Sequence, residues 1–133
     1  MVRPIDIEDL VRTILVDYGL TAYCRPLPES YSLPNILVSA VGGSQDRDWN
    51  GIDQFDRFIV NLNCRASDEA SALENIRTAI GILQSEQGKR LCSVTVNSAY
   101  SWGRDTVRPD LAYCGSTLII AARPENFTIG GTI

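Results

Sequence analysis

The sequence predicts an α+β fold, in which a mainly antiparallel mixed sheet carries two helices packed on one face. Two observations predict it. Segments 35–41 and 55–65 have the apolar or alternating composition of strands, and a polar stretch separates them. Directly after the second segment, apolar residues recur every three or four positions, which is typical of an amphipathic helix lying on a sheet.

The two strand segments are predicted to form a long hairpin. Segment 35–41 is apolar and rich in β-branched residues, so it belongs in the interior of a sheet. Residues 44–51 are polar and are expected to form the hairpin loop. In the second strand, alternate side chains should face the core, and the others should face solvent or a partner. The core set is Phe58, Val60, Leu62 and Cys64, and the outward set is Ile59, Asn61, Asn63 and Arg65.

Two amphipathic helices are predicted. The first opens the chain, with Asp6 as its N-terminal cap and Gly19 at its C-terminal end. The second follows the hairpin, with Ser67 as its cap and the acidic pair Asp68 and Glu69 in its first turn. The apolar stripes are Ile7, Leu10, Val11, Ile14, Leu15 and Tyr18 in the first helix, and Ala70, Leu73, Ile76, Ile80 and Leu83 in the second.

The rest of the chain supplies further strands. Segment 91–100 is predicted to be a strand, 101–110 a polar loop, and 111–123 a long final strand in which Gly115 marks a bulge or a close approach. Residues 21–25 can add an early edge strand, and the prolines that follow keep most of the next stretch irregular. One domain is therefore expected over 1–123, followed by a flexible C-terminal tail over 124–133.

Composition limits the function classes. The 133 residues carry a net charge of −4, from 16 acidic and 12 basic side chains, which argues against a nucleic-acid coat or an anionic membrane surface as the main partner. Eleven of the basic residues are arginines, which suits protein interfaces, although a compositional habit of the source genome explains this equally well. No apolar run predicts a membrane helix or a signal peptide, so we expect a soluble cytoplasmic protein.

The sequence contains no candidate catalytic, cofactor or metal site that outweighs a structural explanation. It has no histidine, no phosphate-binding glycine loop and four widely spaced cysteines, which we interpret as reduced core residues. The acidic cluster in the first loop can bind a divalent cation, but a solvated hairpin tip is favoured. Similarly, Arg104 and Asp105 are better explained by a salt bridge or a partner contact than by acid–base chemistry. The cluster consists of Asp46, Asp48, Asp53 and Asp56.

Interface residues are the main functional prediction. Two tryptophans lie in polar loops, where each either anchors an interface or folds back over its own hairpin. The candidates are Trp49, Asn61, Asn63, Arg65, Trp102, Arg104, Asp105 and Arg108.

Taken in order, these elements resemble the tail terminator proteins of long-tailed bacteriophages, of which the lambda type is the nearest comparison. The resemblance covers residues 6–123 and depends on short motifs: 33–38 leading into an acidic hairpin, 58–65 running into a helix, and the stretch from Tyr100 to Leu118. Its strongest part is the end, where Tyr113 precedes Ser-Thr-Leu at 116–118. The chain departs from that pattern in its cysteines, its proline-rich stretch and its C-terminal tail.

The resemblance implies a structural subunit without enzymatic activity or cofactor. It implies a homo-oligomeric ring, typically a hexamer, that caps the tail tube, ends its polymerisation and provides the surface for head attachment. The implied partners are the tail tube protein and the head–tail connector protein, with DNA only passing through the lumen and no membrane involved. The implied locations are the host bacterial cytoplasm during assembly and then the virion tail.

Three alternatives remain open. One is a neighbouring role in the same region, as a neck, head-closure or tail-completion protein. Another is a small-ligand-binding regulatory domain, since sheets covered by helices often bind metabolites between subunits. The third is an enzyme that uses carboxylates alone, such as Asp53 or Asp56 with Asp105.

Overall fold

The computed structural model describes residues 4–24, 32–47, 53–97, 100–104 and 111–122. These residues form two helices and six strands. In chain order they are α1 (Pro4–Asp17), β1 (Ala22–Cys24), β2 (Asn35–Arg47), β3 (Asp53–Ala66), α2 (Glu69–Ser85), β4 (Ser93–Val96), β5 (Ser101–Arg104) and β6 (Ala112–Ala122).

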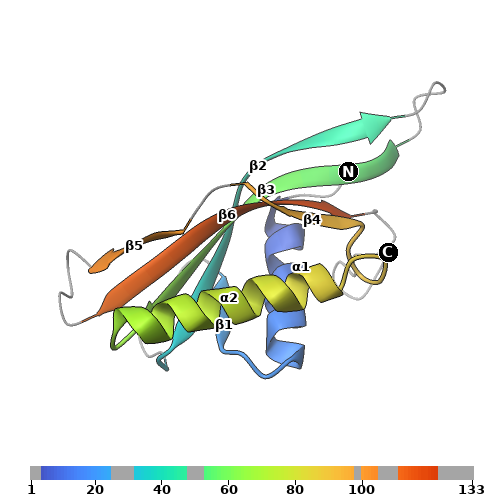
Figure 1. Ribbon diagram of the computed structural model, residues 1–133. Coiled ribbons are helices and arrows are strands. Elements are labelled where there is room, and N and C mark those ends of the chain that lie inside the picture. The colour runs from blue at the N-terminus through green and yellow to red at the C-terminus, as the bar shows by residue number, and fades with distance from the viewer. Residues whose placement is uncertain (1–3, 25–31, 48–52, 98–99, 105–110, 123–133) are drawn as a thin grey trace.

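All six strands belong to one sheet, and both helices lie on the same side of it (Figure 1). The strand order is β1-β2-β3-β6-β4, and β5 pairs with β6 further along the same edge as β4. The pair β1–β2 is parallel, and all the other pairs are antiparallel. The predicted α+β class, with a mainly antiparallel mixed sheet and two helices, is therefore confirmed.

The core lies between the helices and the sheet face that they cover. The strand period of two places every second residue of β3 and β6 on this face, and the predicted inward set of β3 is at most 4% exposed. The same alternation buries Ala112, Cys114, Ser116, Leu118, Ile120 and Ala122 of β6. From α2 the core receives Ala72, Ile76, Ala79, Ile80 and Leu83.

Both predicted N-terminal caps are wrong by a residue or more. Helix α1 begins at Pro4, which places Asp6 in its first turn, because a proline suits the first positions of a helix. Helix α2 is capped by Asp68 and not by Ser67, since the Asp68 carboxylate accepts the Ser71 N–H at 2.7 Å.

One residue of the predicted apolar stripes is exposed, and the predicted glycine at the end of the first helix is confirmed. Ala70 is exposed, because it lies outside the buried stripe of α2, which runs through Ala72 and Ala79. Gly19 has φ of +91°, so the predicted C-terminal glycine of the first helix is confirmed.

The first hairpin contains more strand than the sequence predicts. Strand β2 continues to Arg47 and β3 begins at Asp53, so residues 44–47 are strand and not loop. Polar composition suggested a loop, but the backbone hydrogen bonds of a ladder do not depend on side-chain polarity. The rest of the predicted loop, residues 48–51 with Trp49, lies outside the described residues.

The edge next to β6 is an interrupted strand, which corrects two predicted boundaries. Among the described residues of segment 91–100, the only strand is β4, and the predicted loop 101–110 begins with β5. Val96 pairs with Leu118 and Ser101 with Gly115, so the edge chain carries two residues more than β6 between these pairs. The pairing of β4 with β6 therefore ends before that of β5 begins.

Polar contacts hold the C-terminal ends of the two helices together. Arg90 donates from Nε to Glu86 at 2.6 Å and from Nη1 to Asp17 at 2.7 Å. The Tyr18 hydroxyl donates to the other Glu86 oxygen at 2.9 Å. Because Glu86 is only 3% exposed, these contacts compensate the burial of its charge.

Candidate interaction surface

The face of the sheet opposite the helices is the candidate functional site. No described helix or strand packs on it, and its side chains come from all six strands (Figure 1). Register places them in rows across the strands. The rows are Asn35, Arg65, Tyr113 and Gly103; Tyr23, Leu37, Asn63, Gly115 and Ser101; Ser39, Asn61 and Thr117; Ile59, Ile119 and Thr95; and Arg57, Ala121 and Ser93. We call this set the open face.

The centre of the open face is polar but uncharged. Thr117 donates from its hydroxyl to the Asn61 amide oxygen at 2.8 Å, which ties β3 to β6. Beside them, the Asn63 amide oxygen is buried and has no hydrogen-bond partner. A buried unpaired carbonyl costs free energy, so an additional donor at this position would stabilise the molecule.

Two glycines on this face lie close to a neighbouring strand. A Cβ atom at Gly115 would stand 3.3 Å from the Leu62 carbonyl oxygen, and one at Gly103 would stand 3.2 Å from the Tyr113 hydroxyl. The Tyr113 ring therefore lies across Gly103. The prediction that Gly115 marks a bulge or a close approach is confirmed as a close approach, and the pairing of β6 with β3 is continuous there.

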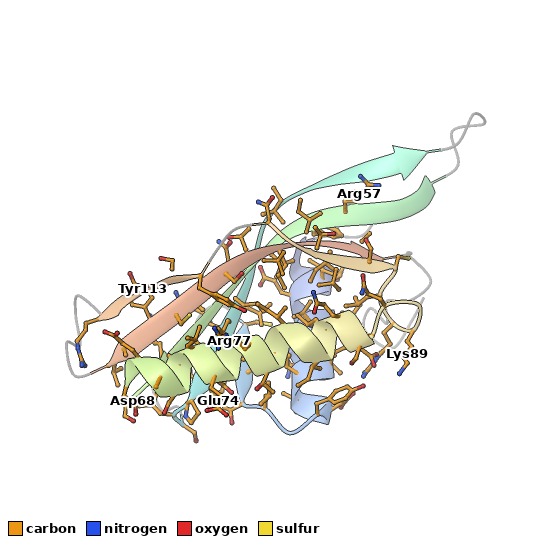
Figure 2. All side chains as sticks on the ribbon, in the orientation of Figure 1. Arg57, Asp68, Glu74, Arg77, Lys89 and Tyr113 are labelled. Carbon is orange, nitrogen blue, oxygen red and sulfur yellow. The ribbon has the colours of Figure 1, made fainter. Side chains whose placement is uncertain are left out.

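Within the rows given above, the charged residues are two arginines near the ends. Arg57 is exposed at the end near the hairpin tip, whereas Arg65 is half-buried beside Tyr113 at the other end. Figure 2 shows Arg57 and Tyr113 far apart along the sheet. Eight of the described carboxylate residues lie in the helices or in the turns that adjoin them, and three lie in the strands of the first hairpin. The eight are Asp6, Glu8, Asp9, Asp17, Asp68, Glu69, Glu74 and Glu86, and the three are Asp46, Asp53 and Asp56. Besides these arginines, the rows contain amides, hydroxyls and the apolar side chains of Leu37, Ile59 and Ile119.

The structure separates the predicted interface residues into two groups. Asn61, Asn63 and Arg65 share the open face, as their alternation in the sequence predicts. Arg104 is different, because it pairs with Ala112, a residue of the covered face. It lies near the start of α2, where its charge contributes to lowering the pKa of Asp68, after the stronger effect of the Ser71 hydrogen bonds.

The remaining candidates are only partly described. Trp102 pairs with Cys114 through the backbone of β5, and its side chain lies outside the description. Trp49, Asp105 and Arg108 lie outside the described residues altogether. The structure adds Thr117, Tyr113 and Gly103 to the site. The alternation of the final strand contained the signal for the first two, since it places both on the face opposite the buried set.

The titratable groups do not form a reactive centre within the described ranges. Burial raises the pKa of Cys64 to about 11, and burial also raises the pKa values of Cys24 and Cys114. These thiols are protonated at neutral pH and are poor nucleophiles. All four cysteines are free, and the described residues contain no group of three or more histidine, cysteine or acidic side chains that could hold a metal ion. The described helices also include none long and apolar enough to cross a membrane.

Comparison with known proteins adds no assignment to this geometry. No protein-family model matches the sequence, and a search of curated proteins finds no significant match.

Proposed function

We propose that this protein is a ring-forming structural subunit that caps a phage tail tube, ends its polymerisation and provides the surface to which the head attaches. The observation that supports the proposal best is the open face. A sheet that is covered by helices on one side and exposes ordered amides, hydroxyls and arginine on the other is suited to contact another protein.

Three further observations support this proposal. The resemblance of residues 6–123 to tail terminators supplies the particular role. The buried thiols and the absence of histidine from the sequence leave catalysis without an evident nucleophile–base pair. A closed ring needs two different surfaces on each subunit, so the open face would supply one of them.

The test is the native mass of the protein over a concentration series, with negative-stain imaging of any large species. We expect particles of about six times the 14.6 kDa subunit, in keeping with closed cyclic symmetry. The same particles should stop the elongation of tail tubes when they are added to polymerising tube protein. A strict dimer that leaves tube growth unchanged would contradict the proposal.

A pair of charge reversals separates assembly from folding. Arg65→Glu changes the open face and should reduce ring formation while the unfolding midpoint changes little. Lys89→Glu makes the same charge change in the exposed turn after α2 and should leave ring formation intact. Equal loss of assembly in both variants would show that net charge matters and not the open face.

Trp102 provides an independent test. If its side chain anchors an interface, Trp102→Ala should weaken assembly more than it weakens folding. Equal loss of both would place the side chain in the core.

A further inference from the structure

The outer edge of β2 changes its hydrogen-bond partner halfway along the strand. At the start of β2, the Ile36 N–H donates to the Thr21 carbonyl at 2.9 Å, and pairing with β1 continues to the register pair Cys24 and Val38. N–H groups two residues apart in a strand point to the same edge. After Ile36 and Val38, the next N–H on this edge belongs to Ala40, two residues beyond the last residue of β2 that pairs with β1.

A side chain of helix α1 takes over where β1 ends. The Ala40 N–H donates to Oε2 of Glu8 at 2.9 Å. Glu8 is 5% exposed, so a carboxylate has been placed inside the protein at the backbone of a strand. Burying a carboxylate is costly unless it receives hydrogen bonds, and a charged acceptor makes such bonds stronger than a neutral one.

The same residue of β2 begins a bulge. Ala40 pairs with Val60, but Gly42 pairs with Ile59, so Val41 is an extra residue in β2. Bulges bend a strand and increase its local twist. Beyond this point the paired segments 42–47 and 53–59, which we call the arm, extend past the ends of β4 and β6 (Figure 1).

Among the described residues, only the base of the arm is held by other elements: residues 56–59 pair with β6, and Phe58 packs in the core. Strand β6 pairs with β3 only as far as Ala122 and Asp56, so the end of the arm consists of two strands. A hairpin of two strands is marginally stable alone, and its direction depends on how its base is held.

We propose that Glu8 is the positioning residue of the arm: its carboxylate continues the outer edge of β2 where β1 ends and fixes the bulge from which the arm projects. The bond to Ala40 also occupies an edge N–H that another strand would otherwise pair with. A consequence for ring assembly rests on the function proposed above, whereas the local role does not.

Two variants of equal length separate the carboxylate's role from its volume. Glu8→Gln keeps an acceptor oxygen, and Glu8→Met fills similar space without one. In Glu8→Met, amide hydrogen exchange at Ala40 and in the arm should accelerate about tenfold or more, as expected for loss of a charge-assisted hydrogen bond. Amides of Leu62, Cys64 and Ser116 in the central ladder should keep their exchange rates, and Glu8→Gln should lie between the Met variant and the unmodified chain.

Asp9→Asn is the matched control, because Asp9 is the neighbouring acid but bonds the exposed Arg12 at 2.7 Å. It should leave exchange in the arm unchanged. Uniform acceleration of all amides in Glu8→Met, or failure of that variant to fold, would overturn the proposal by making Glu8 a general stabiliser of the core. Unchanged exchange in the arm would overturn it too.

Measuring ring formation on the same samples keeps the two proposals apart. If the arm loosens but rings still form, Glu8 positions the arm and the arm does not hold the ring. If the unmodified chain forms no ring and does not stop tube growth, the proposed function fails, and the exchange data still decide the role of Glu8.

Discussion

The two faces of the sheet are built from the same strands, yet they are stabilised differently. In β6, Leu118 is fully buried under the helices, whereas Ile119, the next residue, lies half-buried on the open face beside Ile59 and Thr95. The covered face is apolar and closed by α1 and α2. The open face keeps polar groups in order through cross-strand contacts such as that of Thr117 with Asn61. One face therefore supplies most of the apolar burial, whereas Ile59 and Thr95 on the other are exposed.

Truncating neighbouring residues on the two faces should give the largest contrast. Leu118→Ala should cost about 3 kcal/mol, since it leaves a cavity in a packed core, while Ile119→Ala should cost about 1 kcal/mol. Urea unfolding of both variants measures the difference. Equal costs would mean that something covers the open face as fully as the helices cover the other.

The contact between the helix ends should come next in size. Glu86→Gln should cost about 1 to 2 kcal/mol, because Arg90 and Tyr18 lose a charged acceptor, although partial exposure of Arg90 weakens the pair. Thermal unfolding at neutral pH measures the loss. Glu74→Gln, an exposed change on α2, is the control and should leave the melting temperature nearly unchanged.

The lowered pKa of Glu86 predicts that the stability of the folded chain depends on pH. Arg90 lowers the pKa of Glu86 through its hydrogen bond, and the Tyr18 hydroxyl contributes in the same direction, while burial opposes both. The stabilisation is therefore fully present above the ordinary carboxyl pKa of 4.5 and is lost as the pH falls through the lower pKa of the folded state. Stability of the native chain should fall more steeply than that of Glu86→Gln below about pH 4.5. Parallel curves would contradict this.

The cap of α2 should give a smaller effect with a clear control. Asp68→Ala should lower the melting temperature, because the Ser71 N–H loses its acceptor, whereas Ser67→Ala should leave it unchanged. The pKa of Asp68 is lowered, first by the Ser71 N–H and then by the Ser71 hydroxyl, so the difference between the native chain and Asp68→Ala should shrink in acid. A larger loss from Ser67→Ala would restore the cap predicted from the sequence.

The smallest effect on folding is expected at Asn63. Asn63→Val removes a buried amide oxygen without a partner, so the free energy of unfolding should stay the same or rise slightly. Ring formation should weaken if the open face is an interface. Thr78→Val, on the exposed side of α2, should not affect the ring. An Asn63→Val chain that assembles normally would exclude this residue from the interface.

Much of the fold follows from local patterns, and part of the site follows with it. The alternation from Phe58 to Arg65 predicts correctly which side chains are buried and which share the open face, because a strand alternates its side chains strictly. Strand limits are less predictable. Polar residues 44–47 are strand because they have a partner strand, and 101–104 pair with β6 after an offset of the edge. The sequence shows neither partner.

By itself, then, the sequence determined the fold class, the inward and outward sets of β3 and the glycine that ends α1, since each depends on the period or backbone freedom of nearby residues. Only the tertiary structure decided which chains meet. It brought Glu8 to the backbone of β2, joined Arg90 to both helix ends, placed Tyr113 across Gly103 and moved Arg104 to the face opposite Arg65. These contacts join residues that are distant in the chain or lie on different strands. They depend on how the strands and helices pair and pack, and local composition does not encode that pairing.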